Sequence, residues 1–115
     1  MGTVKLDIVV RQGATFELTV QARNADGTVK DLTGYTGRMQ IRPYVDSTDV
    51  LLDAVVSGTI TITSAQGIVA VSVPANITAA MDWSSGVYDL EVFSSAANVI
   101  RLVEGNASFS KEVTR

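Results

Sequence analysis

The chain has 115 residues, of which 46% are apolar and 18% charged, and its formal net charge is −3. This length predicts one domain, residues 1–115, and the absence of cysteine and histidine excludes disulfides, thiol chemistry and a histidine base or metal ligand. Nine Lys and Arg residues are scattered singly among twelve Asp and Glu residues, so no basic face is available for nucleic acid.

The first third of the chain alternates apolar and polar residues, which is typical of half-buried strands. This pattern predicts strands over residues 4–10 and 16–21, each with one apolar face. Asn24, Asp26 and Gly27 form a strong turn signal, because Asn and Asp side chains bond nearby backbone groups and Gly accepts positive φ. A short strand is expected after this turn, at residues 28–30.

The middle of the chain predicts a corner between two sheets at residues 32–35, followed by a long strand over residues 36–42. Pro43 ends this strand because proline cannot donate a hydrogen bond to a neighbouring strand. Residues 44–49 are expected to form an exposed loop. The apolar run over residues 50–56 predicts the next strand.

Strict alternation continues over residues 59–63 and 68–73, on either side of a Gln-Gly turn, and predicts two more strands. Residues 74–81 predict one short helix, because Pro74 suits an early helical position and Ile77 and Met81 fall on one face.

The last third of the chain predicts a hairpin with strands over residues 87–93 and 99–103 and its loop at residues 94–98. Gly105 and Asn106 indicate a bulge or turn before a final strand over residues 107–113. About eight strands at this spacing, with one helix near 74–81, predict an all-β antiparallel sandwich.

Catalytic motifs are absent from the sequence. Serine has no histidine to activate it, and there is no Gly-x-Ser-x-Gly elbow. Asp89 and Glu91 share one strand face near Glu104, as paired carboxylates of a glycosidase would, but Arg101 opposite them favours a solvated, ion-paired hairpin face. We therefore expect no enzyme activity and no cofactor.

Four residues are candidates for contact with a partner: Tyr44, Asp46, Asp49 and Trp83. Tyr44 follows Pro43 in the expected loop and is the best candidate for an exposed aromatic side chain. Asp46 and Asp49 are acidic loop residues without the spacing of a calcium loop, so turn chemistry is preferred and no metal site is expected. Trp83 follows the expected helix and either caps an open end of the sandwich or is exposed as a stacking surface.

Two groups of segments resemble a known family. They are Leu-Thr-Gly-Tyr-Thr at residues 32–36 with Arg-Met-Gln-Ile-Arg at 38–42, and then Gly-Val-Tyr-Asp-Leu-Glu at 86–91 with Val-Ile-Arg-Leu-Val-Glu-Gly at 99–105 and Glu-Val-Thr-Arg at 112–115. Together they resemble small bacteriophage structural proteins and the immunoglobulin-like domain at the start of phage baseplate upper proteins. The resemblance covers residues 16 to 115.

This resemblance implies an immunoglobulin-like sandwich in a phage particle, in the tail, baseplate or fibre-attachment region, where it docks on other virion proteins. A capsid decoration protein is an alternative, and a module that binds a host-surface glycan is another. Free strand edges predict a homo-oligomer. No apolar run is long enough for a membrane span and no signal peptide is expected, so synthesis in the host cytoplasm is predicted. Residence in the virion is what the resemblance implies.

Overall fold

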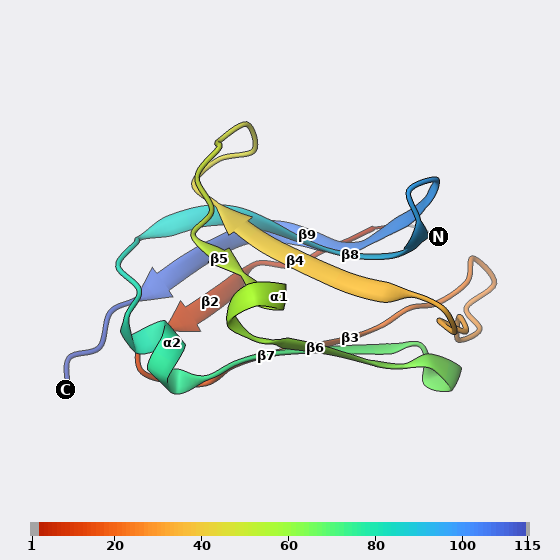
Figure 1. Cartoon of the computed structure of the whole chain (residues 1–115), viewed down its shortest axis with the longest axis horizontal. Coiled ribbons are helices and arrows are strands. Elements are labelled where there is room, and N and C mark those ends of the chain that lie inside the picture. The colour runs from red at the N-terminus through yellow and green to blue at the C-terminus, as the bar shows by residue number, and fades with distance from the viewer. Residues whose placement is uncertain (1–2, 115) are drawn as a thin grey trace.

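The structure, a computed structural model, describes residues 3–114 and consists of two β-sheets packed face to face (Figure 1). Sheet A has the strand order β1-β9-β8-β4-β5, with β2 also paired to β9, and sheet B has the order β3-β7-β6. The strands of sheet A are β1 (Val4–Lys5), β2 (Ile8–Arg11), β4 (Thr36–Arg42), β5 (Leu52–Asp53), β8 (Ser85–Ser95) and β9 (Asn98–Ser110). Those of sheet B are β3 (Phe16–Gln21), β6 (Thr59–Thr63) and β7 (Ile68–Val73).

The predicted all-β sandwich is confirmed. The consecutive pair β8 and β9 lies beside β4, while β3, β7 and β6 form the facing sheet. The other strand pairs are antiparallel, as predicted, with an exception at one edge of sheet A. Strands β1 and β2 run parallel to β9, because the first strand lies along the last one at the edge of sheet A.

The core lies between the sheets and follows the alternation seen in the sequence. Successive side chains of a strand point to opposite faces, so every second residue of β4, β7 and β8 faces inward. The innermost of these are at most 1% exposed: Met39, Ile41, Val69, Val71, Val73, Leu90 and Val92. One apolar cluster therefore holds both sheets together.

The predicted corner at residues 32–35 is confirmed as the connection from sheet B to sheet A. Leu32 is fully buried, and its backbone N–H donates to the carbonyl of Ser64, at the start of the short 3-10 helix η1 (Ser64–Gln66). Gly34 has φ +84°, a left-handed conformation that glycine adopts without strain. The short strand expected at residues 28–30 is reduced to one bridge between Arg23 and Val29.

The helix predicted near 74–81 is present as α2 (Ala75–Ala79). The strand predicted over residues 50–56 is wrong, because β5 ends at Asp53 and α1 (Ala54–Ser57) follows it. The Asp53 carboxylate accepts hydrogen bonds from the backbone N–H groups of Val55 and Val56, which starts the helical turn. This turn carries the chain from sheet A to sheet B. The structure shows no helix among the described residues that could span a membrane.

The break predicted at Gly105 and Asn106 is also wrong, since β9 runs without interruption from Asn98 to Ser110. The irregularity lies earlier, where Leu90 pairs with Val103 but Glu91 pairs with Arg101. Leu102 is therefore the extra residue of a β-bulge, and both Leu102 and Val103 are buried. Val113, expected in the last strand, lies beyond β9 and is 92% exposed.

The strand predicted over residues 4–10 is interrupted at Leu6 and Asp7, which lie outside both β1 and β2. The Tyr88 hydroxyl donates to the Leu6 carbonyl at 2.6 Å, and the Asp7 carboxylate accepts from the Asn106 backbone N–H at 3.0 Å. Gly105 lies directly beneath the Leu6 carbonyl, where a Cβ atom would collide with it. Burial, followed by the nearby Asp7 charge, raises the pKa of Tyr88 to about 12, so the phenol remains a donor at neutral pH.

Candidate functional site

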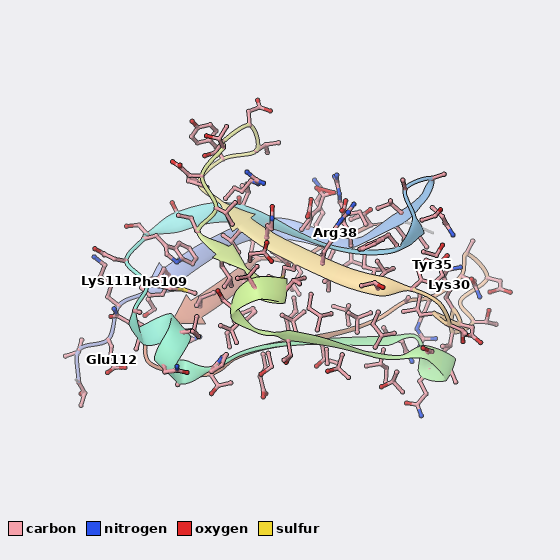
Figure 2. All side chains as sticks on the ribbon, viewed as in Figure 1. Lys30, Tyr35, Arg38, Phe109, Lys111 and Glu112 are labelled. Carbon is pink, nitrogen blue, oxygen red and sulfur yellow. The ribbon has the colours of Figure 1, made fainter. Side chains whose placement is uncertain are left out.

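The outer face of sheet A carries charged and polar side chains, Arg38 among them (Figure 2). The strand registers place these side chains in rows across the sheet. One row joins Arg38 on β4, Glu91 on β8 and Arg101 on β9. The next row runs across the whole sheet through Asp53, Gln40, Asp89, Glu104 and Lys5. Residues far apart in the sequence therefore form one continuous polar surface.

Ion pairs link these rows as the sequence predicts for Asp89, Glu91, Glu104 and Arg101. The Arg38 Nε atom lies 2.8 Å from Glu91 Oε1, and the Arg38 guanidinium also lies over the Phe93 ring, 4.7 Å from its centroid. Arg101 lies 3.5 Å from Asp89, 3.7 Å from Glu91 and 3.7 Å from Glu104. These half-exposed pairs add little stability but define a fixed pattern of charge.

Asp89 lies at the centre of this surface, and the carboxylates of Glu91 and Glu104 lie near it. Burial is the largest cause that raises the pKa of Asp89, and the neighbouring Glu91 is the next. Arg101 acts in the opposite direction without cancelling these effects. Because the folded protein holds this proton more tightly than the unfolded chain, the Asp89 contribution to stability is present at low pH and is lost as pH rises through the folded pKa.

We predict that Asp89→Asn raises the melting temperature at pH 7, because it removes a partly desolvated charge that faces two other carboxylates. The gain should disappear below the normal aspartate pKa of 3.8, where Asp89 itself is protonated. Glu91→Gln is the matched control on the same strand face and should change the melting temperature at pH 7 less than Asp89→Asn, since it relieves the repulsion of Asp89 but weakens the bond to Arg38. Thermal unfolding at pH 3 and pH 7 measures both effects, and a lower melting temperature for Asp89→Asn at pH 7 would contradict the assignment.

The loop after β4, residues 43–50, rises from the outer face of sheet A and is called the Tyr44 loop below (Figure 1). Two neighbouring apolar side chains are exposed on it, Tyr44 at 63% and Val45 at 79%. Asp46 and Asp49 are exposed in the same loop, whereas Ser47 between them is buried. The Tyr44 loop therefore presents an apolar pair with carboxylates beside it.

Hydrogen bonds to the loop backbone hold the Tyr44 loop in one conformation. The Arg42 guanidinium donates to the Ser47 carbonyl at 2.7 Å and to the Gln40 side chain at 2.8 Å. The Ser47 N–H donates to the Tyr44 carbonyl at 3.1 Å, and the Ser47 hydroxyl accepts from the Asp49 N–H at 3.0 Å. Because its conformation is fixed before binding, the loop loses little conformational entropy in a complex.

We predict that Arg42→Lys loosens the Tyr44 loop, since an ammonium group cannot reach the two acceptors that the guanidinium fork spans. The amides of Ser47 and Asp49 should exchange hydrogen roughly 2- to 10-fold faster, equivalent to the loss of one hydrogen bond of about 0.5–1.5 kcal/mol. Amide exchange in β7, on the other sheet, is the internal control and should not change. Unchanged exchange at Ser47 would show that Arg42 does not hold the loop.

The Tyr44 loop overhangs an open hollow of about 460 Å³ on the polar face of sheet A. Val45 lies on one side of this hollow, and the other lining side chains include Gln40, Arg42, Asp89, Arg101 and Glu104. The hollow thus combines an apolar rim with acceptors and donors of both charges. This chemistry suits a polypeptide segment that presents an apolar side chain beside polar ones.

Three of the four predicted contact residues lie together, since Tyr44, Asp46 and Asp49 all belong to the Tyr44 loop. Trp83 does not join them. Its side chain is 9% exposed and its ring packs on Phe109, with the centroids 4.9 Å apart, at the end of the sandwich. Of the two expectations for Trp83, the structure therefore supports the cap and not the exposed stacking surface.

The acidic turns show the turn chemistry expected from the sequence. Asp26 Oδ1 accepts from both the backbone N–H and the hydroxyl of Thr28, and these bonds lower the pKa of Asp26. Over residues 3–114 the structure contains no cluster of three or more acidic side chains arranged to hold a metal ion.

Sequence analysis missed two residues of this site. Val45 is an apolar residue between Tyr44 and Asp46 in an otherwise polar loop, and that isolation was the available signal. Arg42 is the last residue of the predicted strand, and its bond to Ser47 cannot be derived from spacing because it depends on how the loop folds back.

Comparison with known proteins adds no family assignment, since no protein-family model and no curated protein sequence matches the chain.

Proposed function

We propose that this chain is a non-enzymatic docking protein that binds another protein through the Tyr44 loop and the polar face of sheet A. The observation that carries the proposal is the pair Tyr44 and Val45, held exposed by a loop whose backbone is fixed by Arg42. Val55 and Val56 on α1 are also exposed neighbours, at 57% and 81%, but the Tyr44 pair includes an exposed aromatic ring. Binding energy in protein interfaces is concentrated in such anchors, and tyrosine is among the most frequent.

The polar face beside the loop supplies the second part of the proposal. Its ion-paired rows offer charges of both signs in fixed positions, which favour one partner and one orientation over others. Tyr44 and Val45 provide affinity, and the rows of sheet A provide specificity. Val45 from the loop and Asp89, Arg101 and Glu104 from the sheet line the same hollow.

We further propose that the partner is another protein of a bacteriophage particle, in the tail, baseplate or fibre-attachment region. The support is the resemblance carried by residues 38–42, 86–91 and 99–105, which fall in the three adjacent strands β4, β8 and β9. These strands form the floor of the candidate site. A capsid decoration protein would use the same docking surface on the head, so location in the particle separates the two roles.

Glycan binding on a host surface is less well supported. It requires exposed aromatic rings on which sugars stack, and with Trp83 buried, Tyr44 is the exposed candidate that remains. Val45 beside Tyr44 suits a protein surface better than a sugar ring.

The experiment that tests docking is photo-crosslinking from particles assembled with a photoreactive amino acid at position 44. Thr61, on the opposite sheet, is the control position because its side chain is also exposed. We expect position 44 to crosslink one particle protein and position 61 to give no such product. In a binding assay with that protein, Tyr44→Ala should weaken affinity by about 10- to 100-fold, as for a central interface residue. Equal crosslinking from both positions would contradict the proposal.

A further inference from the structure

The outer edge of sheet A is formed by β1 and β2, which pair on one side only. Both follow β9 in a single register, with Val4 opposite Val103 and Ile8 opposite Ala107, so they act as one edge despite the interruption between them. On the other side of this edge the structure places no strand among residues 3–114. An unpaired edge is a template for a strand from another chain.

The free backbone groups on this edge can be identified from the bonds already made. The Leu6 N–H donates to the Glu104 carbonyl and the Gln12 N–H to the Ser110 carbonyl, both at 2.9 Å. Alternate residues of a strand direct their backbone groups to the same side, so the even-numbered residues face β9. Lys5 and Asp7 therefore direct their N–H and C=O groups away from the sheet.

The edge also exposes apolar side chains on the inner face of the sheet. Val4 is 59% exposed and Leu6 is 43% exposed. They border a groove of about 490 Å³ between the two sheets, which Val20 and Leu102 also line. Val4 and Leu6 lie on the core-facing side of the sheet but remain exposed. Exposed apolar surface of this kind favours a partner that buries it.

Charge selects the partner and the register. If a second copy pairs antiparallel along this edge, Lys5 can lie opposite the second copy's Asp7, and Asp7 opposite the second copy's Lys5. One Asp7 oxygen already accepts from the Asn106 N–H, so the Lys5 ammonium of the other copy approaches the second oxygen. Lys5 and Asp7 are both outward-facing, so they form a hydrogen-bonded pair, and Leu6 then meets the second copy's Leu6 on the two-fold axis. In the two nearest alternative registers, shifted by two residues in either direction, Lys5 lies opposite Lys5 or Asp7 lies opposite Asp7. Such like-charge pairs are unfavourable.

Another register would place Asp7 opposite Arg11 of the second copy, with Val9 on the axis. That register leaves Val4 outside the pairing, although Val4 is among the most exposed apolar residues of the edge. The register centred on Leu6 is therefore favoured by both charge and apolar cover.

We propose that two copies of this chain associate through the β1–β2 edge into a two-fold dimer, with Leu6 on the axis and Lys5 paired to Asp7 across it. The two copies of sheet A join into one continuous sheet. Such an interface is self-complementary and closes, so it forms dimers and not fibres. The dimer goes beyond the proposed docking function. Lys5 and Asp7 border the same hollow as Val45, whereas the Tyr44 loop follows β4 and is separated from the β1–β2 edge by β8 and β9.

Single cysteines test this register directly, because the chain contains no native cysteine. In an antiparallel non-hydrogen-bonded pair the Cα atoms lie about 4.5 Å apart, which a disulfide can span. Leu6→Cys should therefore form a disulfide dimer under mild oxidation. Val9→Cys is the matched control, since Val9 is 42% exposed on the same edge but faces Thr3 of the second copy in this register.

We expect the Leu6→Cys variant to crosslink at least about tenfold faster than Val9→Cys, because only the first holds its thiols together before reaction. Lys5→Glu added to Leu6→Cys should remove that advantage, because it places a second carboxylate opposite Asp7 of the other copy. Lys30→Glu, which changes the net charge equally but lies outside the edge, should leave it intact. Circular dichroism checks that each variant is folded.

Two results would overturn the proposal. Equal crosslinking of the Leu6→Cys and Val9→Cys variants would indicate random collision, and faster crosslinking of Val9→Cys would indicate the register centred on Val9. Sedimentation of the unmodified chain provides an independent check, because a monomer at concentrations up to about 1 mM would leave no dimer to explain. If a variant loses the dimer but still binds the partner protein through Tyr44, the dimer proposal and the docking proposal are separated, and the docking proposal is unaffected.

Discussion

Leu90→Ala should lower the free energy of unfolding by about 2–5 kcal/mol, the usual cost of truncating a fully buried leucine. Leu90 is 0% exposed on β8, between Met39 on β4 and Val103 on β9. It therefore lies between two neighbouring strands in the core, so its surroundings can fill only part of the cavity. Because a domain of this kind is stable by only about 5–15 kcal/mol, the substitution removes a large share of that total.

Leu90→Met is the control, since it keeps the volume of the side chain and should cost less than about 1.5 kcal/mol. Urea denaturation followed by far-UV circular dichroism measures both values. A cost below about 1 kcal/mol for Leu90→Ala would show that the two sheets are not packed as described.

Gly105→Val should detach the N-terminal edge of sheet A. A Cβ atom at this position would collide with the Leu6 carbonyl, and the backbone cannot yield as a flexible side chain would. Either β1 separates from β9 or the Tyr88 bond to Leu6 is lost. Overpacking of this kind usually costs about 1–3 kcal/mol, and the branched valine side chain places the expected cost at the upper end.

Asn106→Ala is the neighbouring control, since its side chain is exposed and the substitution should change stability by less than about 0.5 kcal/mol. Hydrogen exchange locates the effect, because the Leu6 amide should lose protection in Gly105→Val while the amides of β7 keep theirs. Tyr88→Phe should cost about 1 kcal/mol alone and less in the Gly105→Val background, where its acceptor has already moved. Full additivity would contradict a shared contact.

The sequence predicted those parts of the fold that depend on local alternation. Strands β3, β4, β6 and β7 lie within a residue of their expected bounds, and the expected inward residues Val69, Val71 and Val73 are buried. Each of these strands has one face on the core, so burial alone imposes a period of two.

The misses share a physical cause, which is contact between residues distant in sequence. Tyr88 bonds the carbonyl of Leu6, 82 residues earlier, and this contact coincides with the break that no local pattern at residues 4–10 reveals. Gly105 resembled a turn signal, whereas its role is to leave room for that carbonyl. Asp53 was read as part of an apolar strand, although its side chain bonds Gln40 and caps α1.

The candidate site was predictable only in part for the same reason. Tyr44, Asp46 and Asp49 were found because a polar run after Pro43 indicates an exposed loop. The rows on sheet A required the registers of β4, β8 and β9, which a single sequence does not specify. Trp83 followed a short helix, a position equally consistent with a cap and with an exposed ring, and its packing on Phe109 distinguishes them.

The most direct test of the proposed role in a phage particle is mass spectrometry of particles purified from the source of this sequence and separated into head and tail fractions. A docking protein of the tail, baseplate or fibre-attachment region should be present in the tail fraction at a fixed copy number and depleted from heads. Recovery from heads would assign it to capsid decoration instead. Absence from both fractions, with the protein detected in the infected cell, would contradict the proposed role in the particle.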